Sequence, residues 1–236
     1  MTSTDFLPSL IVFLAAFVQG AAGVGYAMLA VPLLALMSAN WVPGPMLVGL
    51  VSLALMMVLA GRRAVNPIER RTLIPAVIVG TVFGLGLLTI INEKSSGLIF
   101  GIVVLVGVLI TALGVAADLT KRSLWLGGMA SGLMGTVTGM HGPPLAILYA
   151  RQSPEKARAA IAWIFLVAGS LALLGYAATG RFSWEQFGRG LTLVPGTALG
   201  YLAARAIQNR APVKLIRIVM LSLVSASAVL LIVKSV

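Results

Sequence analysis

The sequence predicts an all-α polytopic membrane protein made of two inverted repeats. Each repeat is a broken or re-entrant helical segment plus three transmembrane helices, giving seven to eight segments in total. Three observations lead there: long apolar runs, a weak internal repeat and an uneven distribution of basic residues. Of the 236 residues, 59% are hydrophobic and 10% are charged, whereas a soluble domain carries about 25% charged residues.

The apolar runs are long enough to be membrane segments, and two of them do not fit plain spans. The first is about 33 residues, or about 50 Å of helix against a hydrocarbon core of about 30 Å, and its middle is rich in glycine. The fifth holds Pro143 and Pro144 after several glycines, and adjacent prolines interrupt a helix. We expect each to be two short helices that meet at a glycine-rich tip. The runs are 6–38, 42–61, 72–91, 97–117, 123–150, 159–178, 187–204 and 213–233.

An internal repeat divides the chain into two halves. At an offset of 112, Gly20, Gly23 and Pro32 match Gly132, Gly135 and Pro144. Further matches follow in the same order at offsets of 118 to 120, for instance 72–75 with 192–195. Ordered matches with a slowly growing offset predict two homologous membrane repeats, 1–116 and 117–236, within one integral membrane domain.

The basic residues favour an inverted second half. If all eight segments cross once, Lys and Arg count 9 on one side and 8 on the other, which is no positive-inside bias. If the fifth segment enters and leaves by the same face, thirteen lie opposite four, namely Lys94, Arg181, Arg189 and Lys234. By symmetry, the first segment is then expected to re-enter from the other face. Eight plain spans with a weak bias remain the alternative.

Two tips that enter from opposite faces would meet near the midplane and form an anion site. Their helix N-termini would present unpaired N–H groups and positive dipole ends, and glycine would let the main chain approach the ligand. The substrate-binding candidates are Gln19, Gly20, Gly23, Gly25 and Tyr26 in the first tip and Gly135, Thr136, Thr138, Gly139, His141, Gly142 and Pro143 in the second, with Ser131 as a further donor.

Plainer structural roles stay open for several candidates. Gly20 and Gly132 suit close helix packing, and the Thr136 and Thr138 hydroxyls suit bonds to carbonyls of their own helix. His141 is the proton-coupling candidate, because imidazole titrates near neutral pH. It could equally donate a hydrogen bond to the anion or face backbone carbonyls.

Composition argues against an enzyme, a cofactor or a metal site. The chain has no cysteine and one histidine, and its six acidic residues fall at segment ends or in loops. The membrane interior is therefore expected to lack a carboxylate pair, a metal-ligand set and a nucleophile with its base. The net charge of +11 is expected from basic cytoplasmic loops, so no nucleic acid is expected to bind. The expected partners are a small anionic substrate and the lipid bilayer, and a homodimer is plausible.

At the two tips the sequence resembles the TauE/SafE family of sulfite and organosulfonate exporters. The motifs that carry the resemblance lie at 17–25 and 30–34 in the first half and at 132–144 in the second. The resemblance implies a multi-pass protein of a bacterial inner membrane that exports small sulfur-containing or carboxylated anions. Tyr26 and His141 depart from the glycines common at their places, and would reshape and polarise the site.

We therefore expect a secondary transporter that exports small anions by alternating access at a midplane site. Sulfite and organosulfonates such as sulfoacetate are the expected substrates. A passive anion channel and a carboxylate permease are the alternatives, and a non-transporting membrane scaffold is a further one.

Overall fold

The computed structural model describes residues 6–61, 66–90, 113–207 and 213–235, together with 102, 103, 105–107 and 109. Within these residues the chain is helical and has no strand. About half of the expected fourth segment, 97–117, falls outside the described residues. So do four basic residues of the charge count, namely Arg62, Arg63, Lys94 and Arg210.

The first long apolar run is broken, as the sequence predicts. Helix α1 (Phe6–Ala22) ends and α2 (Tyr26–Met37) begins on either side of a three-residue turn. Gly23 and Gly25 in that turn have φ angles of +86° and +136°, a region that side chains disfavour. Glycine at these two positions therefore permits the break.

The fifth run is broken too, into α6 (Lys121–Thr138) and α7 (Gly142–Tyr149). Gly139 ends α6 in the left-handed conformation, with φ +80°, which is a common helix C-terminus. The prolines stand in the first turn of α7, where a missing N–H costs little. This break lies about one turn later than the repeat alignment implies, because residues 135–137 are still helical.

The remaining described helices surround these two hairpins. They are α3 (Gly44–Ala60), α4 (Pro67–Leu88), α8 (Pro154–Ala178), α9 (Trp184–Ile207) and α10 (Val213–Ser235), with a short turn η1 at Ala39–Trp41. Of the described helical stretches, three are long and apolar enough to cross a membrane: Ala39–Ala60, Pro67–Leu88 and Pro154–Ala178. The expected count of seven to eight segments stays a prediction.

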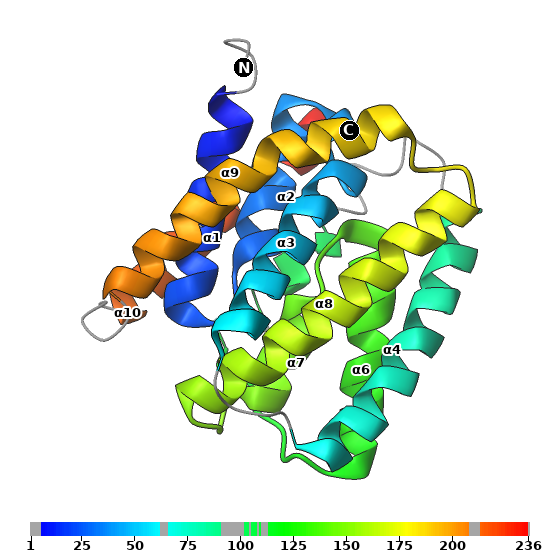
Figure 1. Ribbon diagram of the computed structural model, residues 1–236, viewed down its shortest axis with the longest axis vertical. Helices are drawn as coiled ribbons and strands as arrows, with labels where there is room; N and C mark the ends of the chain where they lie inside the picture. Colours follow the sequence, from blue (N-terminus) through cyan, green and yellow to red (C-terminus); the bar gives the residue numbers. More distant parts are fainter. Residues whose placement is uncertain are drawn as a thin grey trace.

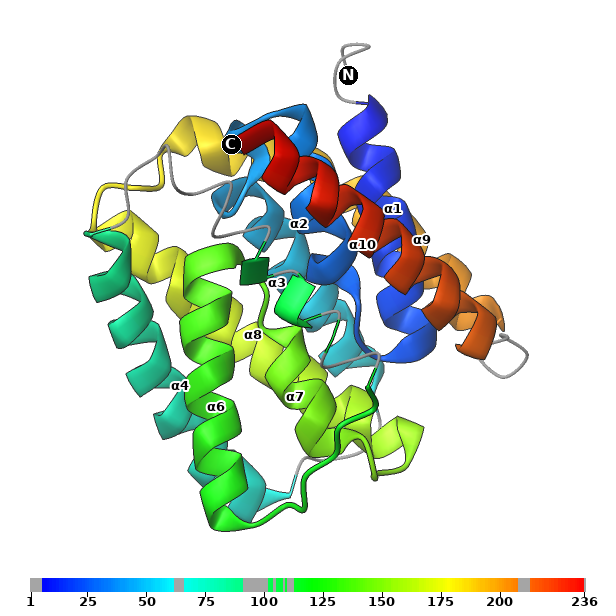
Figure 2. The same cartoon turned by 180° about the vertical axis from the view of Figure 1, so that it is seen from behind.

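The two hairpins run in opposite directions. In the views of Figures 1 and 2, α1 descends and α2 returns upward, whereas α6 rises and α7 returns downward. Helix α1 packs on α9, α6 packs on α4, and α3 packs on α8 between them. Each hairpin thus packs on a helix from the other half of the sequence, as two inverted halves would. The boundary between 1–116 and 117–236 stays a prediction.

Glycines set the close approach in both of these helix pairs. A methyl group at Gly200 on α9 would lie 2.1 Å from the carbonyl oxygen of Phe13, and one at Gly80 on α4 would lie 2.1 Å from that of Met129. The two glycines are the positions that the repeat aligns at 120 residues. Small residues of this kind let membrane helices pack backbone to backbone.

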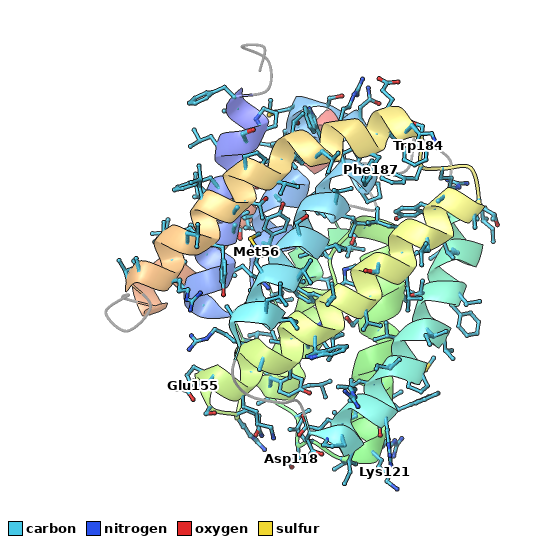
Figure 3. The ribbon with its side chains drawn as sticks, in the orientation of Figure 1. Met56, Asp118, Lys121, Glu155, Trp184 and Phe187 are labelled. Carbon is cyan, nitrogen blue, oxygen red and sulfur yellow. The ribbon has the colours of Figure 1, made fainter. Side chains whose placement is uncertain are left out.

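Labelled side chains mark the two ends of the molecule (Figure 3). Asp118, Lys121 and Glu155 lie at one end, and Trp184 and Phe187 lie at the other (Figure 3). Arg151 joins the first group through an ion pair of 2.6 Å with Asp118. We call the end that carries Lys121, Arg151 and Glu155 the basic end.

Candidate functional site

The tips of the two hairpins touch inside the molecule. A methyl group at Gly142, the first residue of α7, would lie 2.9 Å from Cγ2 of Val24 in the first tip and 3.6 Å from Cζ of Phe165 on α8. The ring of Phe165 also lies 6.1 Å from the imidazole of His141, centroid to centroid. The meeting point is therefore formed by both tips and covered by α8.

Gln19 bridges the first break. Its Oε1 accepts a hydrogen bond of 3.0 Å from the backbone N–H of Tyr26, the first residue of α2. This bond fixes the amide orientation, because only the oxygen can accept. The side chain is fully buried, and its Nε2 has no hydrogen-bond partner among the described residues. The oxygen of Gln19 thus binds the turn, while the two N–H donors on its Nε2 are buried and unpaired within the described residues.

Ser131 bridges the second break. Its hydroxyl donates a hydrogen bond of 2.8 Å to the carbonyl of His141, across the turn between α6 and α7. Ser131 stands 112 residues after Gln19, which is the offset of the repeat predicted from the sequence. In both hairpins a polar side chain on the first helix forms a hydrogen bond with the backbone at the start of the second helix.

His141 lies at the centre of the second tip and is fully buried. Its ring lies on the α-carbon of Gly135, where a methyl group would be 2.2 Å from Nε2. The backbone of Gly139 and Ala168 faces the ring. Within the described part of the chain, neither ring nitrogen makes a hydrogen bond of acceptable geometry. The imidazole is therefore held by packing, and its nitrogens face two backbone groups without a well-formed hydrogen bond to either.

Two threonine hydroxyls are also buried without a partner in the described structure, those of Thr136 on α6 and Thr81 on α4. A methyl group at Gly84 on α4 would lie 2.7 Å from Cβ of Thr136, so the side chain lies at the α4–α6 interface. Tyr176 on α8 donates its hydroxyl to the Thr136 carbonyl. Sequence reasoning missed Tyr176 and Thr81, because each is brought to α6 only by packing between distant helices.

The main-chain donors of the two tips are unequal. The first-turn N–H groups of a helix have no partner within it, and in α2 one of these, that of Tyr26, is bound by Gln19. In α7, Pro143 and Pro144 have no N–H to offer. Gly107 packs on Pro143, and a methyl group at Gly107 would lie 2.8 Å from Cγ of the proline. The first tip thus contributes more backbone donors, and the second contributes His141.

Three sequence candidates have other partners. The Tyr26 hydroxyl shares a hydrogen bond of 3.2 Å with Thr197 on α9. The Thr138 hydroxyl donates to the Met134 carbonyl and accepts from the N–H of Met140. Gly20 packs on α9, where its methyl would lie 2.7 Å from Cβ of Ala204. Packing and back-bonding therefore account for the Gly20 and Thr138 positions.

A charged side chain that sequence reasoning missed contacts the first break. A methyl group at Gly23 would lie 2.8 Å from Cγ of Arg158 on α8, and Nη1 of that arginine donates to the Ala21 carbonyl at 3.5 Å. No local motif marks Arg158, because the contact joins residues 137 positions apart.

Glu69 forms a buried ion pair near the basic end. It lies in the first turn of α4, as expected for an acid at a segment end, but is only 5% exposed. Its carboxylate lies 3.0 Å from Nζ of Lys156 and accepts a hydrogen bond of 2.9 Å from the Tyr149 hydroxyl. Glu69 thus ties a helix of the first half to α7 and α8 of the second, a link that sequence reasoning missed.

Long apolar helices and two opposed broken hairpins with polar atoms at their meeting point characterise a helical membrane protein, of a kind that secondary transporters exemplify. The family model described as Sulfite exporter TauE/SafE matches residues 9–231. The chain therefore belongs to the TauE/SafE family, which confirms the resemblance seen at the tips. Membership implies a membrane transporter of the sulfite or anion type rather than an enzyme. Comparisons with curated proteins and with solved structures gave no significant match.

Proposed function

We propose that the protein is a secondary transporter that exports small anions, with sulfite and organosulfonates such as sulfoacetate as substrates, across a bacterial inner membrane. The observation that carries this proposal is the set of buried polar atoms, unpaired within the described residues, on the two hairpins: Nε2 of Gln19, Oγ1 of Thr136 and both ring nitrogens of His141. The Gln19 amide, the Thr136 hydroxyl and one nitrogen of a neutral imidazole, or both nitrogens of a protonated one, can donate hydrogen bonds that an oxyanion accepts.

The energetics favour this assignment of the unpaired groups. A buried donor without a partner costs about 1–3 kcal/mol, so each of these groups is costly unless a ligand binds it. A sulfonate or sulfite carries three oxygens with several lone pairs, which can accept from N–H and O–H donors. In the described structure the one carboxylate that is buried, that of Glu69, is already paired with Lys156, which leaves the tips suited to an anion.

Alternating access is the proposed mechanism, and the opposed hairpins support it. Gln19, Thr136 and His141 are fully buried, so solvent reaches these side chains from neither end in this conformation. This burial favours a carrier over an open channel. Because α1–α2 and α6–α7 enter from opposite ends (Figures 1 and 2), a relative movement of the two proposed inverted halves would open the tips to one end at a time.

His141 is the proposed proton-coupling residue, since it is the histidine of the chain and lies at the tip contact. If protons move with the anion through the imidazole, replacing it should change the pH dependence of transport. Flux of His141→Gln and wild type, measured from pH 5.5 to about 8 around the usual histidine range, should then differ in profile. Identical profiles would exclude the coupling role while leaving anion binding intact.

A thermal-shift screen of the purified protein tests the proposal. Sulfite and sulfoacetate should raise the melting temperature with concentration, because a ligand that binds only the folded state stabilises it. Taurine, which adds an ammonium group, should be weaker. A larger shift with simple carboxylates would instead support a carboxylate permease. If no anion shifts the melting temperature and none is transported by reconstituted protein, the proposal is wrong.

A further inference from the structure

A polar cluster lies between the second tip and the basic end. It consists of Glu69 in the first turn of α4, Tyr149 at the last position of α7 and Lys156 near the start of α8. We call it the Glu69 cluster. Helix α7 begins at the tip, at Gly142, and returns toward the basic end over eight residues, or about 12 Å, to Tyr149 (Figures 1 and 3). Glu69 and Tyr149 are both buried.

The contacts of the cluster join distant parts of the chain. The Glu69 carboxylate lies 3.0 Å from Nζ of Lys156 and accepts a hydrogen bond of 2.9 Å from the Tyr149 hydroxyl. Nζ of Lys156 also donates a hydrogen bond of 3.1 Å to Oε1 of Gln152, in the connection between α7 and α8. The cluster thus holds α4 against both ends of the α7–α8 connection, on the basic side of the second tip.

An ionic contact suits a position that opens and closes. A buried ion pair adds little net stability over apolar residues of similar volume, because both ions lose their hydration. When the pair separates, its ions regain water, whereas a separating apolar contact exposes hydrophobic surface to water. The carboxylate, ammonium and phenol of the Glu69 cluster therefore stabilise one closed arrangement and keep the cost of an open one low.

The corresponding positions of the first hairpin are built differently. With the offsets of 112 and 120 that the sequence predicts, Tyr149 corresponds to Met37, the last residue of α2, and Glu69 corresponds to Arg189 on α9. Met37 is apolar and exposed, and Arg189 forms an ion pair of 2.7 Å with Glu185 of its own helix. In the described structure a buried polar tie between the halves is therefore found at the Glu69 cluster and not at these two positions.

We propose that the Glu69 cluster is the gate of the transport path at the basic end. While it is formed, α4, α7 and α8 are held together and the second tip is closed to that end. When Glu69 separates from Tyr149 and Lys156, the second hairpin and α8 move away from α4, and the tip opens to the basic end. This inference rests on the proposed function, because a gate requires a cargo. It adds the contact that must break before an anion passes between the tips and that end.

A buried reporter on α7 tests this gate. Leu145 lies one turn before Tyr149 and is fully buried, and the chain has no cysteine of its own. In membrane vesicles, adding Glu69→Gln to Leu145→Cys should speed the reaction with an impermeant maleimide about tenfold or more, because loss of a hydrogen-bonded charge shifts a two-state equilibrium by about this factor. The reaction should occur from the side on which Lys121→Cys reacts. Tyr149→Phe removes only one hydroxyl and should give a smaller increase.

Two controls separate gating from general loosening. Arg181→Gln removes an exposed hydrogen bond of 2.8 Å to the Leu88 carbonyl, which also links the two predicted halves. This change should leave the labelling of Leu145→Cys from the basic end unchanged. Leu193→Cys is a second fully buried reporter, on α9, which packs on α1 and α3. Its reaction should be no faster when Glu69→Gln is added.

The outcomes separate this inference from the proposed function. If Glu69→Gln lowers the melting temperature but Leu145→Cys still reacts at the original rate, the cluster is structural and the inference is wrong. It is also wrong if Leu145→Cys and Leu193→Cys become faster by the same factor. If Glu69→Gln does not fold, Tyr149→Phe decides in the same way, by faster or unchanged labelling. The labelling needs no anion, so a failure of the proposed function is seen separately, as wild-type protein that neither moves nor binds sulfite.

Discussion

The imidazole of His141 lies directly on the α-carbon of Gly135, where a methyl group would be 2.1 Å from Cδ2 of the ring. The absence of a side chain at Gly135 therefore fixes the position of the histidine in the second tip. The two residues are joined by the turn between α6 and α7, and Ser131, one turn before Gly135, binds the histidine's carbonyl. Local chain geometry thus sets the ring where the tips meet.

Gly135→Ala should displace this ring. Overpacking of a close contact costs about 1–3 kcal/mol, so we expect a lower melting temperature and a lost sulfite-dependent shift. Gly188→Ala on α9 is the control, since no described atom lies within 4 Å of the added methyl. It should be neutral or stabilising by about 0.5–1 kcal/mol. Wild-type stability and wild-type anion binding in Gly135→Ala would contradict the described ring position.

Tyr26→Phe should affect stability but not transport. The change removes the hydrogen bond to Thr197, at a cost of about 0.5–1.5 kcal/mol, and keeps the backbone bond to Gln19. Melting temperature and sulfite flux measured on the same preparation check this. A loss of flux at unchanged stability would show that the phenol binds substrate, as the sequence suggested.

Glu69→Gln should destabilise the protein much more than Asp118→Asn. Both changes remove the acid of an ion pair, but the Glu69 side chain is 7% exposed and that of Asp118 is 76% exposed. Loss of a charged hydrogen-bond partner in a buried site costs about 1–3 kcal/mol, whereas exposed pairs contribute about 0–1 kcal/mol. Thermal melting of both variants in the same detergent compares them, and equal shifts would mean that Glu69 does not hold the two halves together.

Single introduced cysteines test the topology, because the chain has none of its own. Lys121→Cys and Lys156→Cys should react with a membrane-impermeant maleimide from the same side, since Lys121 and the neighbouring Glu155 lie at one end of the molecule (Figure 3). Trp184→Cys should react from the opposite side. Labelling of positions 121 and 156 from opposite sides would contradict the inverted arrangement of the halves.

The breaks in the two long apolar runs could be predicted because their causes are local. Positive φ angles at Gly23 and Gly25 and the missing N–H of Pro143 are properties of single residues. The place of the second break was less predictable. Residues 135–137 continue α6 by about one turn beyond the aligned position, because the helix stays packed on α4 through Thr136 and Gly84.

The side-chain partners at the site were harder to predict, since they join distant parts of the sequence. The Tyr26 hydroxyl binds a residue 171 positions away, and Tyr176 reaches the Thr136 carbonyl across 40 positions. Polarity marked Gln19 and His141 as candidates, but only packing distinguishes a hydroxyl that is already bonded, as in Thr138, from one that is not, as in Thr136.

Gln19→Glu tests the central claim most directly. A glutamate oxygen can still accept the N–H of Tyr26, but the two unpaired N–H donors are replaced by an anionic oxygen that repels an anion. Gln186→Glu is the matched control, because the half-buried Gln186 also accepts a backbone N–H, that of Ser183, in a solvent-exposed hydrogen bond. Sulfite efflux from proteoliposomes should be carried by wild type and Gln186→Glu and abolished in Gln19→Glu, whose melting temperature should also fall because a buried carboxylate is costly. Equal efflux in all three would contradict an anion site at the two tips.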